Sequence, residues 1–106
     1  MDHPLLMHPQ DIHTLRQEMG VSQRKFAQIL NVGHQTIRRW EHGITAPSEM
    51  HTALMEQLWQ EVQRRKEKER RQQWVNSLLA LAAGGAFGAL LGKIFSDAAK
   101  EKEGTT

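Results

Sequence analysis

Apolar residues recur every three or four positions from Ile12 to Leu58, and no part of this region alternates apolar with polar residues. A spacing of three or four is typical of one face of an α-helix, whereas alternation indicates a strand. Gly20, the turn Asn31-Val32-Gly33 and Gly43 interrupt the pattern, and a glycine can end a helix in the left-handed conformation. The region therefore predicts short helices and an all-α fold.

Three helices are predicted before residue 45. We expect them at about Pro9–Met19, Ser22–Leu30 and His34–His42. The side chains expected on their inner faces are Ile12, Leu15, Met19, Phe26, Ala27, Ile29, Leu30, Ile37 and Trp40. The hydroxyl of Ser22 can cap the second helix, because it can accept a hydrogen bond from a backbone N–H of the first turn.

A fourth helix is predicted to begin at Pro47-Ser48, because proline is common in the first turn of a helix and serine is a good cap. Its apolar edge would be formed by Met50, Leu54, Leu58 and Val62. The edge fades after Val62, and we expect the helix to extend through the residues that follow.

The formal net charge of +2 is unevenly distributed along the 106 residues. Residues 1–50 hold five basic and five acidic side chains, and residues 75–106 hold three of each. Residues 64–71 hold six basic and two acidic side chains, so long-range attraction to a polyanion comes mainly from this stretch. The alternative is a solvated helix face whose charges form ion pairs four residues apart.

Residues 21–48 carry the most specific pattern in the chain. Ala27 is small enough for a close helix crossing, and Val32 and Ile37 can seal the corner between two helices. Ten positions match a known pattern: Gln23, Ala27, Leu30, Val32, Thr36, Ile37, Trp40, Glu41, Gly43 and Pro47. With them the chain resembles the helix-turn-helix family of Cro and the phage repressors, over about residues 9–62. The resemblance implies a domain of four to five helices that binds double-stranded DNA. The spacing of Gly84, Gly88 and Gly92 near the C-terminus suggests self-association, which agrees with a homodimer that reads two half-sites.

The exposed side of the predicted third helix carries side chains suited to reading bases. Glutamine can pair with adenine and arginine with guanine through two hydrogen bonds each. The resemblance places the base contacts at His34, Gln35 and Arg39. It places backbone contacts, which position the protein without specifying sequence, at Gln23, Arg38 and His42.

Arg24 and Lys25 are also expected to contact the DNA backbone. They lie in the first turn of the second helix, where the helix dipole disfavours cations. A phosphate at this helix end would reverse that penalty. Lys25 and Gly33 depart from the family, which commonly has Glu at the first position and a Ser or Thr cap at the second.

The resemblance further implies a structural ion pair between Arg16 and Glu41. The family pairs an arginine of its first helix with the glutamate that ends its third. Because the pair would be partly buried, we expect it to contribute more than a surface pair does.

The C-terminal segment presents a choice. Residues 72–92 are 21 consecutive uncharged residues, long enough to cross a hydrocarbon layer of about 30 Å at about 1.5 Å per residue. Trp74, the preceding basic stretch and the spacing of Gly84, Gly88 and Gly92 favour a transmembrane helix with the N-terminal domain cytoplasmic. This layout is similar to that of the cell-shape protein RodZ. The alternative is an Ala/Gly-rich oligomerisation helix, or a helical hairpin broken near Gly84-Gly85 that packs on a partner or a second copy.

The organisation expected from these patterns has four parts. Residues 1–62 form the DNA-binding domain with an extended fourth helix, 63–73 a basic helical linker, 74–95 a hydrophobic glycine-rich helix and 96–106 a disordered tail. No cysteines are present, the histidines do not follow zinc-site spacing, and no catalytic constellation is evident, so we expect no enzyme, metal or cofactor.

The predicted function is a dimeric transcriptional regulator, a repressor, in the cytoplasm on the nucleoid or anchored at the inner membrane. One alternative is a membrane-anchored scaffold whose helix-turn-helix binds protein. Another is an antitoxin with a toxin partner, since the motif also resembles antitoxin regulators of the HigA and MqsA kind.

Overall fold

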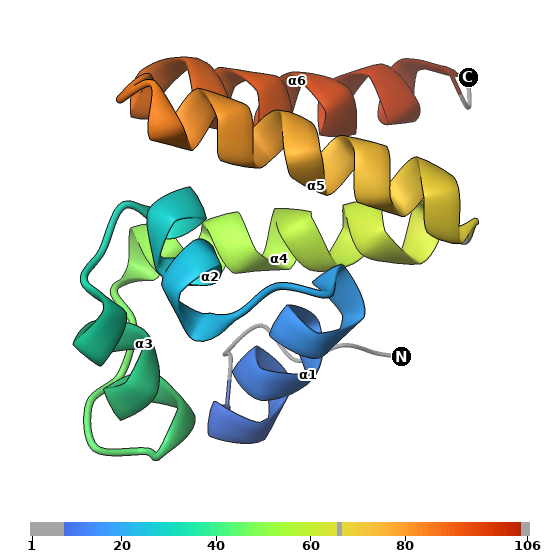
Figure 1. The fold of residues 1–106 in the computed structure, drawn as a ribbon. Helices are drawn as coiled ribbons and strands as arrows, with labels where there is room; N and C mark the ends of the chain where they lie inside the picture. The colour runs from blue at the N-terminus through green and yellow to red at the C-terminus, as the bar shows by residue number, and fades with distance from the viewer. Residues whose placement is uncertain (1–7, 66, 105–106) are drawn as a thin grey trace.

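The computed structural model describes residues 8–65 and 67–104, with the backbone alone for 96–104. The described residues form six helices and no strand, so the predicted all-α class is confirmed. In chain order the helices are α1 (Pro9–Met19), α2 (Gln23–Leu30), α3 (His34–Glu41), α4 (Glu49–Arg64), α5 (Lys68–Ala83) and α6 (Phe87–Gly104) (Figure 1).

Local signals set the boundaries of the first three helices. α1 ends at Gly20 and α2 at Asn31, with φ of 71° and 57°, both in the left-handed region. The backbone N–H of each of these residues caps carbonyls of the last turn, as a left-handed helix end allows. Ser22 caps α2 as predicted, because its Oγ accepts a hydrogen bond from the backbone N–H of Lys25 at 3.2 Å.

The apolar faces of all six helices meet in one core. Its buried members are Ile12, Leu15, Met19, Val21, Phe26, Ala27, Ile29, Leu30, Ile37, Trp40, Leu54, Met55, Leu58, Val62, Trp74, Val75, Leu78, Leu90 and Ile94. Every inward position predicted for the first three helices is in this set. Met50 is not: this side chain is 49% exposed in the first turn of α4, and the inward edge of that helix begins at Leu54.

The prediction that the fourth helix extends through the basic stretch is wrong, since α4 ends at Arg64. Arg71 supplies the physical reason. Its guanidinium donates to the backbone carbonyls of Val62 and Arg65 at 3.4 and 3.1 Å, and to that of Glu18 in α1 at 3.1 Å. These bonds satisfy carbonyls that a helix end would leave without partners, and they hold α5 back against the domain.

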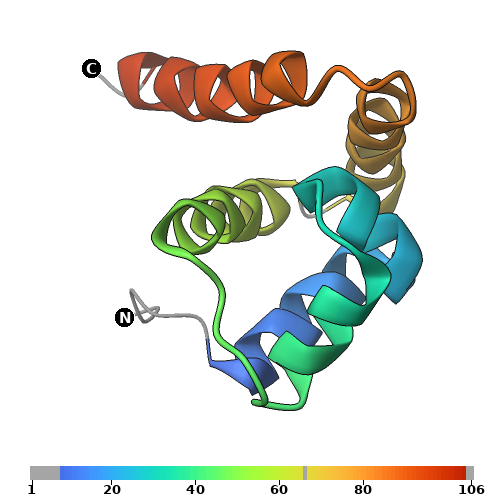
Figure 2. The ribbon, with the colours of Figure 1, turned by 90° about the vertical axis from the view of Figure 1, so that its left-hand side faces the viewer.

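The segment predicted as one hydrophobic helix over residues 74–95 is a helical hairpin that breaks near Gly84-Gly85, as one alternative had it. That alternative had the hairpin packing on a partner or a second copy, whereas in this structure it packs on the domain of its own chain. α5 ends at Gly84, Gly85 has a φ of 74°, and the chain turns into α6. α5 packs on α2 and α1, while α6 packs on α4 and α5. Figure 2 shows α6 lying over α4, with α5 alongside. No helix within residues 8–65 and 67–104 is long and apolar enough to cross a membrane, so the expected transmembrane span is absent there.

The three glycines predicted to pack helices together do not do so within the chain. Gly84 caps α5, and a Cβ atom built at Gly88 or Gly92 would meet nothing within 4 Å. The backbone of α6 also remains helical to Gly104, although we expected a disordered tail from residue 96. Thr105 and Thr106 lie outside the described residues.

Candidate nucleic-acid interface

α3 projects from the end of the molecule opposite the α5–α6 hairpin (Figure 1). Ile37 and Trp40 anchor its inner face and are 0% and 4% exposed. The turn before it is short and rigid, because the N–H of Val32 donates to the carbonyl of Ala27 at 3.0 Å, and that of Thr36 to the carbonyl of Gly33 at 3.0 Å. Gly33 begins the helix in an extended conformation without a side-chain cap, as its lack of a side chain requires.

The outer face of α3 is polar and basic. Gln35, Arg38, Arg39 and the following His42 are exposed, whereas His34 is half-buried. Gln35 lies three residues before Arg38 and four before Arg39, so the three side chains share one helical face. None of them is paired with a carboxylate by a hydrogen bond or ion pair found among the described residues. The face therefore presents two guanidinium groups and one amide to solvent.

The first turn of α2 adds two cations. Arg24 and Lys25 are exposed there, and that turn contains no acidic residue. The first backbone N–H groups of a helix and two cations together form a favourable position for a phosphate.

Residues 12–51 match a family model described as Helix-turn-helix. The match supports the predicted resemblance of these residues to the helix-turn-helix of Cro and the phage repressors. No curated protein and no solved structure matches the chain. A helix-turn-helix of this type is a DNA-binding regulatory domain, with α2 and α3 as the two helices of its motif.

The ion pair predicted within the helix-turn-helix is present. Arg16 Nε donates to Glu41 Oε2 at 2.7 Å, and Arg16 Nη2 donates to Glu41 Oε1 at 3.2 Å. The side chain of Glu41 is 6% exposed and that of Arg16 15%. Arg16 also donates to the backbone carbonyl of Val21 at 3.2 Å, so one guanidinium joins α1, the start of α2 and the end of α3.

Two further side chains complete this cluster around the buried carboxylate of Glu41, and the sequence did not indicate that either would contact it. Gln23 Nε2 donates to Glu41 Oε1 at 3.1 Å, and His13 Nδ1 lies 3.3 Å from the same oxygen. Gln23 was expected to contact the DNA backbone, but in this structure its amide is engaged with Glu41. Burial alone would raise the pKa of Glu41, but hydrogen bonds from Arg16, Gln23 and His13 and the charge of Arg16 outweigh it, so the pKa is lowered.

His51 ties α4 to the helix-turn-helix. Its Nε2 lies 3.2 Å from the backbone carbonyl of Leu30, the last residue of α2, and its Nδ1 lies 2.8 Å from the hydroxyl of Ser48. The ring also lies 5.4 Å from that of Trp40 in α3. Pro47-Ser48 indicated the helix start correctly, but no sequence pattern pointed to the contact of His51 with α2.

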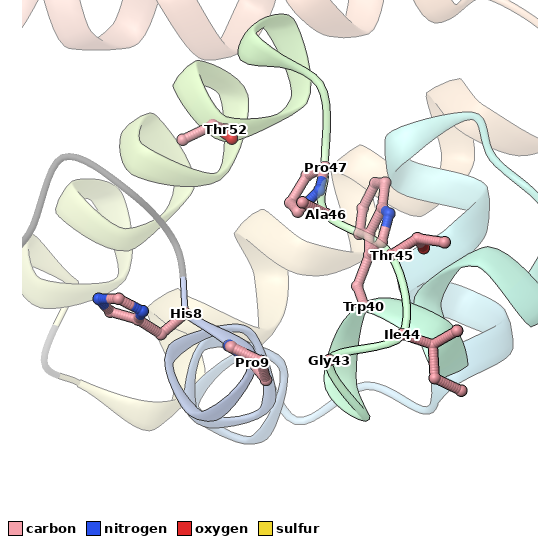
Figure 3. Close-up of a pocket in the computed structure, with 9 residues that line it drawn as sticks. All are labelled: His8, Pro9, Trp40, Gly43, Ile44, Thr45, Ala46, Pro47 and Thr52. Carbon is pink, nitrogen blue, oxygen red and sulfur yellow. The ribbon is translucent and has the colours of Figure 1, made fainter.

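A hollow of about 430 Å³ lies beside the end of α3 (Figure 3). It is lined by His8, Pro9, Trp40, Gly43, Ile44, Thr45, Ala46, Pro47 and Thr52. Among the described residues, its lining contains no Lys, Arg, Asp or Glu and is mainly apolar, so it does not offer a phosphate the charges that the faces of α2 and α3 offer. Ile44 at its edge is 70% exposed.

Proposed function

We propose that the chain is a sequence-specific transcriptional regulator that binds double-stranded DNA and represses. The observation that carries the proposal is the outer face of α3, where Gln35 and Arg39 are exposed on a helix anchored by buried residues. Both side chains can form the paired hydrogen bonds that distinguish bases in the major groove, and each such pair discriminates by about 1–3 kcal/mol.

The proposed contacts divide into reading and positioning. Gln35 and Arg39 read bases, together with His34 at the start of the helix. Arg24, Lys25, Arg38 and His42 flank them and contact phosphates, which fixes the register of α3 in the groove. Gln23 joins these positioning contacts only if its amide leaves Glu41, so we assign it the structural role that its hydrogen bond supports.

We further propose that the regulator acts as a homodimer, because one recognition helix reads too few base pairs to select a genomic site alone. The outer face of α6 is the surface proposed for the contact. Gly88 and Gly92 leave it open, and Phe95, one turn further along, is 42% exposed.

Gly92→Lys should abolish the dimer without disturbing the fold, because a side chain there meets no neighbour within 4 Å. The measurement is sedimentation equilibrium of the wild type and of Gly92→Lys. The same mass for both proteins would show that the outer face of α6 is not a dimer contact.

The double variant Gln35→Ala with Arg39→Ala tests the function in cells. Chromosomal occupancy and co-purifying proteins are measured from the same cultures. The matched control is Gln72→Ala with Arg70→Ala, which removes the same two residue types from the exposed face of α5.

The proposal expects the recognition variant to lose site-specific occupancy while the control variant retains it. A scaffold that uses its helix-turn-helix to bind protein would give another result: occupancy would be absent or equal in all three proteins, and the recognition variant would lose a protein partner. That result would replace the DNA-binding proposal.

A further inference from the structure

The end of α4 lies away from α3 (Figure 1), and the residues there form a second basic surface. There the end of α4, the first half of α5 and one residue of α6 enclose a hollow of about 570 Å³. Four basic side chains line it: Arg64, Arg65, Arg70 and Lys93. A duplex bound by α3 would not cover this hollow, because it lies at the far end of the molecule.

The folded chain gathers this charge from separate segments. Arg64 and Arg65 end α4, Arg70 lies in the first turn of α5, and Lys93 comes from α6. The alternative stated above for the basic stretch was a solvated helix face with internal ion pairs. Such a face would not bring a lysine from another helix to the same hollow. The α5–α6 hairpin is therefore what turns a basic sequence into a concave basic surface.

Acidic groups only partly offset the positive charge. Glu67 is the one acidic side chain in the lining, and it pairs with Arg70 at 3.0 Å on an exposed surface, where such pairs are weak. Glu61 lies buried beneath and holds both Arg64 and Arg65. Among the described residues the lining holds four cations and one carboxylate, and Glu61 holds two of the arginines in place.

The wall of the hollow contains a donor without an acceptor. Trp74 lines the hollow and is 5% exposed, and its Nε1–H has no hydrogen-bond partner among the described residues. The guanidinium of Arg65 lies 5.0 Å from the centre of the indole ring, so the charge and the indole belong to one site.

We propose that this hollow binds the phosphoryl groups of a small soluble ligand, of the class of pyrophosphate and its nucleoside esters. Arginine forks match phosphate oxygens with two hydrogen bonds, and several cations favour more than one phosphoryl group. Gln73 and Ser77 also line the hollow and can hydrogen-bond the rest of the ligand. Its volume is within the range of about 300–1,000 Å³ usual for small-molecule sites. The ligand joins α4, α5 and α6, so its binding stabilises the hairpin on the domain.

The test uses the full chain with pyrophosphate as the probe, in calorimetric titration and thermal unfolding. Arg70→Gln with Lys93→Gln removes two cations of the hollow and keeps Arg64 and Arg65, which hold the buried Glu61. The control, Lys68→Gln, removes a charge from the same basic stretch outside the lining of the hollow. At 100 times the dissociation constant, pyrophosphate should raise the Tm of the wild type by more than about 5 °C.

The proposal expects at least about tenfold weaker pyrophosphate binding in the hollow variant and unchanged binding in the control. It also expects pyrophosphate to shift the ¹H–¹⁵N signal of the Trp74 indole, assigned from Trp74→Phe, more than the other indole signals. The shift itself is measured on the wild type, and Trp74→Phe serves only to assign the signal. Parallel arms use a duplex of random sequence and vesicles containing anionic phospholipid.

Absence of binding, or equal binding by all three proteins, would overturn the proposal. A shift of the Trp74 indole signal caused by the duplex or the vesicles but not by pyrophosphate would also overturn the proposal. The site would then bind a macromolecular polyanion.

Discussion

The buried cluster around Glu41 predicts that Arg16→Met destabilises the domain far more than the loss of a surface ion pair would. The substitution keeps most of the aliphatic stem of the side chain and removes the guanidinium. Glu41 would lose its bonds at 2.7 and 3.2 Å and keep only those from Gln23 and His13. The carbonyl of Val21 would lose a donor as well.

The magnitude follows from burial and charge. Hydrogen bonds to charged groups contribute about 1.5–3 kcal/mol each, and removing one partner of a buried pair costs about 3–5 kcal/mol. Arg16 retains some contact with solvent and two other donors remain, which favours the low end of this range. We expect a loss of about 3 kcal/mol in the free energy of unfolding, and a Tm lower by about 12 °C or more.

Urea unfolding of a double-mutant cycle provides the assay. Arg16→Met, Glu41→Met and the double variant are compared with the wild type at neutral pH. The double variant should be more stable than Arg16→Met alone, because the carboxylate that lost its partner is gone too, with a coupling energy of about 2 kcal/mol. Additive effects, or a loss below about 1 kcal/mol for Arg16→Met, would refute the reasoning.

Four further outcomes are expected. The lowered pKa of Glu41 means that its stabilising charge is fully present above the ordinary pKa of 4.5 and is lost as the pH falls through the lower folded pKa. The stability advantage of wild type over Glu41→Gln should therefore shrink below pH 4.5 in acid unfolding, and a constant difference would contradict this. Gly43→Ala should cost about 1–2 kcal/mol in urea unfolding, because Gly43 has a φ of 73°; no loss would mean that the turn relaxes. Leu90→Ala should cost about 2–5 kcal/mol and lower the Tm in one cooperative transition, since Leu90 is 0% exposed between α6 and the core; an early separate transition would show that the hairpin melts independently. Arg24→Gln with Lys25→Gln should reduce the slope of log K for duplex binding against log salt concentration by an amount that corresponds to about two phosphate contacts, as measured by anisotropy across a salt series. An unchanged slope would show that these two side chains do not contact phosphates.

Local chemistry made the helix-turn-helix predictable. Gly20, Asn31 and Ser22 act within one turn of the helices that they end or begin, so their effect can be recognised without knowledge of the rest of the chain. The inward positions of α1–α3 follow from helical periodicity for the same reason. The pairing of Arg16 with Glu41 could be anticipated only from the family resemblance, since the two residues are far apart in the sequence.

Non-local contacts explain what the sequence did not predict. The end of α4 depends on Arg71 reaching back to carbonyls of α4 and α1. Residues 74–95 suit one long helix or two short ones, and burial of Leu90 and Ile94 against the core accompanies the second arrangement. The amide of Gln23 turns to Glu41 because the fold brings a buried carboxylate beside it. A helical pattern reveals an apolar face but not what will cover it.

Selection from a pool of randomised duplexes tests the central claim most directly. The wild type and the Gln35→Ala, Arg39→Ala variant are each carried through the same rounds, and the enriched sequences and their dissociation constants are compared at one salt concentration. The wild type should enrich a defined sequence and bind it at least about 1,000-fold more tightly than random DNA, and the variant should lose this preference while keeping its non-specific affinity. No enrichment by the wild type, or the same sequence enriched by both proteins, would contradict the claim that α3 reads DNA.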